Sequence, residues 1–344
     1  MKTKIIILLC FTAFLTSHGC IIQSVEVREP LPDIIWPKPP ETPRILLLNS
    51  FSKPEHLNLK DSALKRIFSF LDEKRERAIV KPYGIEVDSA GRYFVVDTHS
   101  KSIHVFDRAN GNYYTFPGDE TSFESPIDVA LGKDGRVYVS DSKEAVIKVF
   151  ENYGKTFVGD TGKGFLGRPT GIDINETTNE LLVVDTLNSQ IIRYDINTME
   201  FRGTIGRSGS EEGEFHFPTN IFVTKDGHIY VSDSLNFRVQ IFSPDGIFLH
   251  AFGKVGNSPG FFSRPRGIAV DSDGNIYVVD ALFDNVQVFN KQGNLLMDFG
   301  GPGYGYGEFW LPSGIFIDDR DRIFVSDTYN KRIQVFQYLK DGEF

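Results

Sequence analysis

The sequence predicts an all-β fold, a six-bladed β-propeller whose blades are four-stranded antiparallel sheets. A short apolar strand ending in Asp recurs six times, the segments around it alternate between apolar and polar residues, and the two chain ends hold complementary parts of one blade. The composition agrees, because 13% aromatic residues and 32 Gly favour strands joined by turns over long helices. These observations exclude a disordered chain and a helical bundle.

The repeated strand reads YFVVD, VYVSD, LLVVD, IYVSD, IYVVD and IFVSD. Its final residues are Asp97, Asp141, Asp185, Asp233, Asp280 and Asp327, spaced by 44 to 48 residues. A proline stands 15 or 16 residues before each Asp and opens another apolar strand. Turn pairs such as Asp226-Gly227 and Asp273-Gly274 join the two strands, which predicts tight hairpins. Each unit is therefore expected to form one antiparallel blade around a shared axis.

The chain ends predict how the ring closes. The sixth unit stops after its third strand, whereas residues 44–50 (RILLLNS) form a strand with no unit of its own. Pairing the two would complete the sixth blade and remove exposed sheet edges. We expect a propeller over residues 44–340, with blade cores near 79–117, 123–159, 166–206, 215–253, 262–300 and 309–338, the last completed by 44–50. Residues 61–75 carry one apolar stripe and predict a short amphipathic helix that caps the ring.

The N-terminus predicts export. Lys2 and Lys4 precede an uncharged apolar run over residues 5–15, which is typical of a signal peptide and too short to span a bilayer. Gly19-Cys20 resembles the end of a bacterial lipobox, although Ser17 and His18 depart from that pattern. We expect residues 1–19 to be removed, Cys20 to be lipidated, and residues 20–43 to form a proline-rich tether. The protein would then be anchored in the bacterial cell envelope, facing the periplasm or the cell surface. An ordinary secreted protein cut nearby is the alternative.

Three segments of the repeat carry a family resemblance. Phe-x-x-Pro-x-Gly-Ile, Ile-Tyr-Val-Ser-Asp and Asn-x-Arg-Val-Gln-Ile-Phe, the last at residues 236–242, resemble the NHL repeat. The chain is similar over residues 44–338 to bacterial six-bladed propeller lipoproteins built from that repeat. The first two units depart, because Ser100 and Ser102, and then Glu144 and Val146, replace the Asn and Arg of the third-strand motif. Such a motif specifies the fold far better than the function.

The six recurring Asp residues are expected to be structural. An acidic residue repeated in every blade is best explained by a geometry that each blade shares, such as hydrogen bonds from the backbone of an adjacent loop. Functional residues should instead lie where the repeats differ.

One candidate surface lies on the loops that follow these Asp residues. Two positions past each Asp stand His99, Lys143, Leu187, Leu235, Leu282 and Tyr329. Apolar side chains on loop tips of four successive blades predict a docking surface for a protein, peptide or lipid. The candidate partner surface comprises Leu187, Leu235, Phe237, Leu282, Phe283 and Tyr329. Folding of these side chains back over neighbouring blades is the alternative.

A second candidate lies at the axial opening, where the innermost strands begin. The residues just after the blade-opening prolines include Tyr83, Asp128, Thr170, Asn220, Arg266 and Ser313. Glu86 and Asp173 follow on two of the same strands. The candidate axial pocket for a small polar ligand comprises Tyr83, Glu86, Asp128, Asp173, Asn220 and Arg266. Ordinary drift among repeats, with polar side chains merely solvated in the channel, is the alternative.

The sequence favours a non-catalytic, envelope-anchored binding or scaffold module that presents its loop face to a protein, peptide or other ligand, without a cofactor. A net charge of −9 and the absence of a basic stripe argue against nucleic acid. The histidines occupy unrelated blade positions, which argues against a zinc lyase. The alternative function is a metal-dependent hydrolase or lyase. It rests on a partial resemblance to gluconolactonase-like propellers, in which Glu86, Asp128 and Asn220 would hold a divalent cation such as Ca²⁺.

Overall fold

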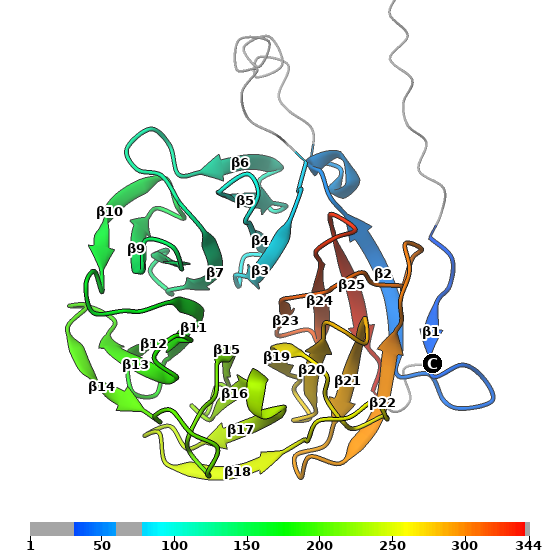
Figure 1. Ribbon diagram of the computed structural model, residues 1–344. Helices are drawn as coiled ribbons and strands as arrows, with labels where there is room; N and C mark the ends of the chain where they lie inside the picture. Colours follow the sequence, from blue (N-terminus) through cyan, green and yellow to red (C-terminus); the bar gives the residue numbers. More distant parts are fainter. Residues whose placement is uncertain (1–30, 60–77, 341–344) are drawn as a thin grey trace, which may run out of the picture. The chain divides into compact units, whose positions relative to one another are not determined.

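Six antiparallel sheets surround a central axis, and each contributes its first strand to the axis (Figure 1). This computed structural model describes residues 31–59 and 78–340. Five sheets have four strands each, and the sixth has five. The predicted all-β, six-bladed propeller with four-stranded blades is confirmed.

The blades follow one another along the chain, and blades 1 to 5 each run from their innermost to their outermost strand. Blade 1 comprises β3 (Pro82–Val87), β4 (Arg92–Asp97), β5 (Ser102–Asp107) and β6 (Asn112–Phe116). Blade 2 comprises β7 (Pro126–Leu131), β8 (Val137–Asp141), β9 (Val146–Glu151) and β10 (Thr156–Thr161). Blade 3 comprises β11 (Pro169–Asn175), β12 (Glu180–Asp185), β13 (Gln190–Asp195) and β14 (Phe201–Ile205).

The remaining blades repeat this arrangement. Blade 4 comprises β15 (Pro218–Val223), β16 (Ile229–Asp233), β17 (Arg238–Phe242) and β18 (Phe248–Phe252). Blade 5 comprises β19 (Pro265–Val270), β20 (Ile276–Asp280), β21 (Asn285–Phe289) and β22 (Leu295–Gly300). Blade 6 comprises β23 (Ile315–Ile317), β24 (Arg322–Asp327), β25 (Arg332–Tyr338), β2 (Ile45–Phe51) and β1 (Ile35–Trp36).

The ring closes as the sequence predicts. Strand β2 pairs antiparallel with β25, so that Leu46 lies opposite Gln337 and Asn49 lies opposite Val335. Strands from the two ends of the propeller sequence thus belong to one sheet. Their pairing closes the ring between blades 6 and 1.

The last part of the proline-rich segment differs from a free tether. Ile35 and Trp36 form β1, which pairs with β2 and adds a fifth strand to blade 6. The Trp36 ring packs 5.9 Å from the ring of Phe299 and 5.8 Å from that of Phe336, measured between centroids. The sheet of blade 6 therefore begins at residue 35 rather than at residue 44, because the partly buried Trp36 packs against two buried phenylalanine rings.

Two blades also contain a strand that the repeat pattern does not display. Outer strands β6 and β10 complete blades 1 and 2, although the alternating pattern for a fourth strand is evident only in the next three units. Within the described residues the helices are two short 3₁₀ turns, η1 (Pro54–Leu57) and η2 (Ser234–Asn236), and neither has the length or composition to cross a membrane. The expected helix at 61–75, the signal segment 1–19 and Cys20 lie outside the described residues.

The core lies between neighbouring blades. Between blades 1 and 2, Phe116, Phe123 and Phe150 form one buried aromatic cluster, with ring centroids 5.0 to 6.5 Å apart. An apolar residue three positions before each blade-opening proline is buried at the corresponding place in every blade: Ile79, Phe123, Leu166, Phe215, Phe262 and Phe309. Each blade therefore contributes one buried apolar side chain to the contact with the neighbouring blade.

Close packing of the innermost strands explains the glycine of the Pro-x-Gly-Ile pattern. A Cβ atom on Gly314 would lie 2.2 Å from the carbonyl oxygen of Tyr83, and one on Gly267 would lie 2.5 Å from that of Ser313. Both distances are shorter than any real contact of a Cβ atom. Glycine at this position allows adjacent blades to approach at the axis, where the ring is narrowest.

Candidate functional site

The six repeated Asp residues are buried and hydrogen-bonded. Each ends the second strand of its blade, and its carboxylate accepts backbone N–H groups from the loop just before the blade-opening proline. In blade 6, for example, the N–H of Trp310 donates to Asp327 Oδ1 over 2.9 Å. All six side chains are 0% exposed: Asp97, Asp141, Asp185, Asp233, Asp280 and Asp327. Because their oxygens already serve the blade itself, they match the structural role that the sequence favours.

The third-strand motif completes this network in blades 4 and 6. Asn330 Nδ2, Arg332 Nε and Gln334 Nε2 all donate to the Asp327 carboxylate, over 2.9, 2.7 and 3.1 Å to Oδ2. Arg332 also donates to the carbonyl oxygens of Gly305 and Glu308, so it ties the incoming loop to the blade. The Asn-x-Arg-x-Gln spacing is therefore explained by convergence on one buried carboxylate.

In blade 1, a different residue partners the repeated aspartate. Asp97 lies beside His104, with 3.5 Å between Oδ2 and Nε2, and both side chains are fully buried. Burial alone would raise the pKa of Asp97, but hydrogen bonds from His104 and from the backbone of Val80 and Ser100 outweigh it and lower the pKa to about 2. The departures from the repeat motif in this unit thus preserve the carboxylate network.

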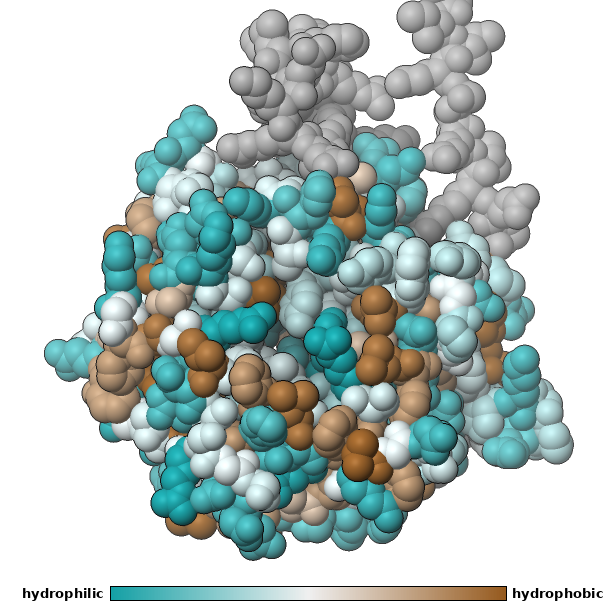
Figure 2. All heavy atoms as spheres, viewed as in Figure 1, coloured by the Kyte–Doolittle hydropathy of each residue, from teal (hydrophilic) through white to brown (hydrophobic). Residues whose placement is uncertain are grey.

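The loop tips after these Asp residues carry exposed apolar side chains. Leu187 is 58% exposed, Leu235 45%, Leu282 53% and Tyr329 45%. Figure 2 shows one end of the ring, where hydrophobic side chains gather around the central opening with hydrophilic ones between them. The three leucines do not fold back into the core, and each occupies the same position on one of three successive blades. We call Leu187, Leu235 and Leu282 the leucine arc.

Two other predicted members of this surface are less accessible. Phe237 is partly buried and packs against the apolar cluster that contains Val239 and Phe262. Its backbone has φ of 55°, a left-handed conformation that turns the chain into β17. Phe283 is also partly buried. These two side chains are therefore less accessible to a partner than the leucine arc.

The structure adds an aromatic group that the sequence interpretation missed. Trp310 and Tyr304 come from the loop before blade 6, and their ring centroids are 5.3 Å apart. The Trp310 ring also lies 5.2 Å from that of Tyr329, and all three side chains are exposed. The available signal was the position between the apolar anchor and the blade-opening proline, where this blade alone has Trp. We call Tyr304, Trp310 and Tyr329 the aromatic group.

The axial residues divide into two sets. Glu86, Asp128, Asp173 and Asn220 line one hollow between the innermost strands, as predicted. Tyr83 and Arg266 do not line it, and instead the Arg266 guanidinium lies 5.7 Å from the centroid of the Tyr83 ring. The candidate axial pocket therefore retains its three carboxylates and its amide, while the predicted guanidinium belongs to a separate contact.

Thr170 and Ser313, from the same row, are occupied in contacts between blades. Thr170 Oγ1 donates to the carbonyl oxygen of Thr219 over 2.8 Å and lies 2.7 Å from Thr186 Oγ1. Ser313 Oγ lies 2.8 Å from Thr328 Oγ1 of the same blade, and Thr328 Oγ1 donates to the carbonyl oxygen of Pro82 in blade 1 over 2.9 Å. These hydroxyl groups hold adjacent blades together at the axis.

Electrostatics distinguish the hollow from the rest of the molecule. Burial raises the pKa of Asp128 and Asp173 to about 7, against backbone hydrogen bonds that lower it. Burial, reinforced by the negative charges of Asp173 and Asp128, raises the pKa of Glu86 well above its usual range. No lysine, arginine or histidine is among the residues that line this hollow. The pKa values of all three carboxyl groups are therefore raised by burial without a positive counter-charge among the lining residues.

The residues of the predicted divalent-cation site lie in this hollow. Among residues 31–59 and 78–340, no three His, Cys, Asp or Glu side chains are placed so that they could hold one ion. Glu86, Asp128 and Asn220 all line the hollow, which the gluconolactonase-like alternative requires of its ligands.

Comparison with known proteins supports the fold. A family model described as a 6-bladed beta-propeller matches residues 209–284 and 271–344. Comparison with curated proteins gives no significant match.

Many solved structures are similar to this chain. A protein of unknown function from Bacteroides thetaiotaomicron aligns with a TM-score of 0.60 and 19% identity, over 76% of this chain and 70% of its own. An auxiliary nutrient binding protein from Bacteroides ovatus aligns with a TM-score of 0.60 and 13% identity, over 75% of this chain and 69% of its own. Virginiamycin B lyase from Staphylococcus aureus aligns with a TM-score of 0.55 and 15% identity, over 76% of this chain and 96% of its own. At these identities the likeness concerns the fold alone.

Proposed function

We propose that this protein is a non-catalytic binding module of the bacterial cell envelope, built from NHL-type repeats and anchored through a lipid on Cys20. The leucine arc carries the proposal. Three leucines at equivalent loop tips, each 45% to 58% exposed, present an apolar surface. It lies at the end of the ring that also holds the loops connecting one blade to the next. Side chains of this kind become buried when a partner docks, which gives a favourable hydrophobic contribution.

Two further observations support this proposal. The aromatic group on blade 6 adds three exposed rings with polar tips, a composition common at protein and ligand interfaces. The solved structures with similar folds include auxiliary nutrient binding proteins from Bacteroides species. A protein, peptide or other ligand in the envelope is the partner that we propose.

Substitution of the leucine arc tests the interface. The variant Leu187→Ser/Leu235→Ser/Leu282→Ser should lose a partner that the wild-type protein captures from an envelope extract. The matched control is Ile247→Ser/Leu249→Ser/Leu296→Ser, because these side chains are 67%, 50% and 53% exposed on outer strands and their turns. The control should retain the partner. Equal capture by the arc variant and the wild-type protein would contradict the proposed interface.

The anchor is tested by a separate variant. Cys20→Ser removes the thiol that would accept the lipid, so the protein should move from the membrane fraction to the soluble fraction. Mass spectrometry of the purified wild-type protein should find acyl chains on Cys20. Unchanged membrane association of Cys20→Ser would exclude the lipid anchor while leaving the leucine arc unaffected.

A further inference from the structure

The hollow at the propeller axis has two chemically different sides. The innermost strands of blades 1 and 4 face each other across the ring, as do those of blades 3 and 6 (Figure 1). Glu86 on β3 and Asp173 on β11 occupy the same strand position in blades 1 and 3. Phe222 on β15 and Phe316 on β23 occupy that position in the two opposite blades, and all four residues line the hollow. Carboxylates therefore face aromatic rings across the axis.

Asp128 extends the acidic side into blade 2. Its Oδ1 accepts the N–H of Val129 over 3.0 Å, and its Oδ2 accepts the N–H of Ile172 over 3.2 Å. A carboxylate has about four acceptor sites, so each oxygen keeps capacity for another donor.

Asp173 is placed in the same way one blade further along. Its oxygens accept the N–H groups of Ile174 and Val223 over 2.7 and 2.6 Å. The backbone thus orients both Asp carboxylates, while no cationic side chain among the lining residues neutralises them. A buried negative charge without a counter-charge is unfavourable, so this side of the hollow attracts a cation.

An unpartnered amide provides an independent indication of a ligand. Asn220 lines the same hollow and is only 7% exposed, yet its Oδ1 has no hydrogen-bond partner. A buried polar atom without a partner costs free energy that a bound donor would recover. Asn220 also stands where four of the six blades have glycine, so this amide does not arise from the shared geometry of the repeat.

We propose that the axial hollow binds the primary ammonium group of a small organic molecule. An ammonium group has three N–H donors, for which the carboxylates of the hollow and the unpartnered Oδ1 of Asn220 are acceptors, and its charge replaces the missing counter-charge. Phe222 and Phe316 provide ring faces that attract a cation and apolar surface for the adjoining methylene groups. A metal ion that requires three acidic or imidazole ligands fits less well, because no three such side chains in the described residues are placed to hold one ion, whereas one carboxylate and one amide oxygen are sufficient for an ammonium group. This site is separate from the leucine arc and does not depend on it.

The experiment titrates the full protein at pH 7.5 with n-propylammonium, and with 1-propanol, propionate and Ca²⁺ as comparison probes. Ligands of this size bind weakly, so we expect saturable binding of n-propylammonium with a Kd of about 0.1–10 mM. NMR chemical-shift changes should be largest at the amide groups of Ile172 and Val223, because these donate to the two Asp carboxylates. The neutral and anionic probes should not bind.

Three variants locate the binding. Glu86→Gln and Asp173→Asn should each weaken n-propylammonium binding by about tenfold, and Phe222→Leu by a smaller factor. The matched control Asp319→Asn, at an exposed carboxylate, should leave binding unchanged. If Glu86→Gln or Asp173→Asn fails to fold, the other variant still decides, because each removes one carboxyl group from the hollow.

Several results would overturn the proposal. These are no saturable binding of n-propylammonium, equal binding of 1-propanol, or undiminished binding in a folded Glu86→Gln or Asp173→Asn protein. Tighter binding of Ca²⁺ that is lost in the same variants would replace the ammonium site with a metal site. Neither result would bear on partner capture by the leucine arc, so the two proposals fail independently.

Discussion

The backbone N–H of Ile172 in blade 3 donates a hydrogen bond of 3.2 Å to the Asp128 carboxylate of blade 2. Val223 of blade 4 donates in the same way to Asp173 of blade 3. Carboxylates that would otherwise be unfavourable at the axis thus connect successive innermost strands. The Asp128 and Asp173 carboxylates therefore link blades while carrying charge that no cationic side chain of the hollow compensates.

Stability should fall as these carboxyl groups ionise. The pKa values of Asp128 and Asp173 are raised to about 7 in the folded protein, whereas an unfolded Asp titrates at about 3.9. Protonation therefore favours the folded state. That contribution is complete below about pH 4 and is lost as the pH rises through about 7. Since the side-chain amide in Asp173→Asn does not titrate, this variant should gain more than about 1 kcal/mol relative to wild type between about pH 4.5 and 8, measured by urea unfolding.

A control separates this effect from the titration of other groups. Asp319→Asn alters an exposed carboxylate, so its difference from wild type should stay constant within about 0.5 kcal/mol over the same range. A constant difference for Asp173→Asn as well would show that its pKa is not raised in the folded protein.

The close approach of blades 6 and 1 makes Gly314 sensitive to substitution. Gly314→Ala places a Cβ 2.2 Å from the carbonyl oxygen of Tyr83, so the innermost strands must separate. We expect the free energy of unfolding to fall by about 1–3 kcal/mol. Gly118→Ala is the matched control, because its Cβ would meet nothing within 4 Å, and it should have little effect. Equal midpoints of thermal unfolding for the two variants would contradict this account.

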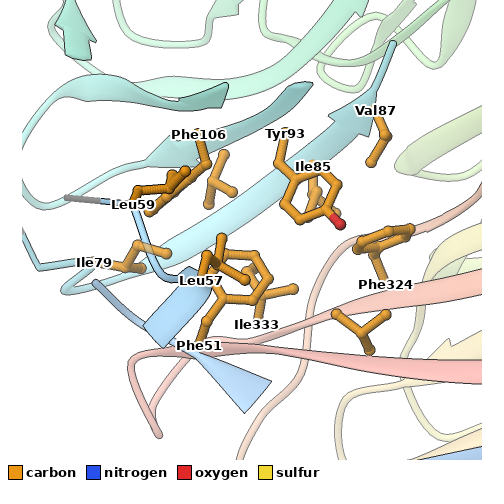
Figure 3. Packing of buried hydrophobic residues seen from close by; sticks show 12 residues of the cluster. Phe51, Leu57, Leu59, Ile79, Ile85, Val87, Tyr93, Phe106, Phe324 and Ile333 are labelled. Atoms are coloured by element: carbon orange, nitrogen blue, oxygen red, sulfur yellow. The ribbon is translucent and has the colours of Figure 1, made fainter. Parts of the chain in front are cut away.

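Phe51 secures the strand that closes the ring. Its fully buried ring lies 5.2 Å from that of Phe106 and 5.7 Å from that of Tyr93, so β2 of blade 6 packs directly on blade 1 (Figure 3). Phe51→Ala should lower the free energy of unfolding by about 3–5 kcal/mol in urea. On the same strand, Leu48 is 40% exposed, and Leu48→Ala should change stability by less than about 1 kcal/mol. Similar losses for both variants would argue against tight closure.

The Asp327 network should be equally sensitive. Asp327→Ala leaves the Arg332 guanidinium, the Gln334 amide and the Trp310 N–H without their shared acceptor. Removal of one partner from a buried charged network costs about 3–5 kcal/mol. Asp327→Asn keeps one acceptor oxygen and should lose less, which differential scanning calorimetry can resolve. Equal stability of Asp327→Ala and wild type would show that the network does not support the blade.

Sequence periodicity predicts much of this fold. Within each unit, alternation of apolar and polar residues predicts the strands, and Asp-Gly pairs predict turns. Both are local properties that do not depend on distant residues. Ring closure was also predictable, because the strand at residues 44–50 and the incomplete sixth unit define a single missing pair. The leucine arc followed from position in the repeat, since equivalent residues in equivalent loops occupy equivalent places.

Contacts between separate segments of the chain depended on tertiary structure. Nothing in the local pattern shows that Trp36 docks on Phe336, that Arg266 leaves the hollow to lie over Tyr83, or that Trp310 joins Tyr329. Likewise, the sequence supplies Glu86, Asp173, Phe222 and Phe316 as separate members of four strands. Only the closed ring sets the acidic residues across the axis from the aromatic ones, because the sixfold arrangement determines which blades face each other.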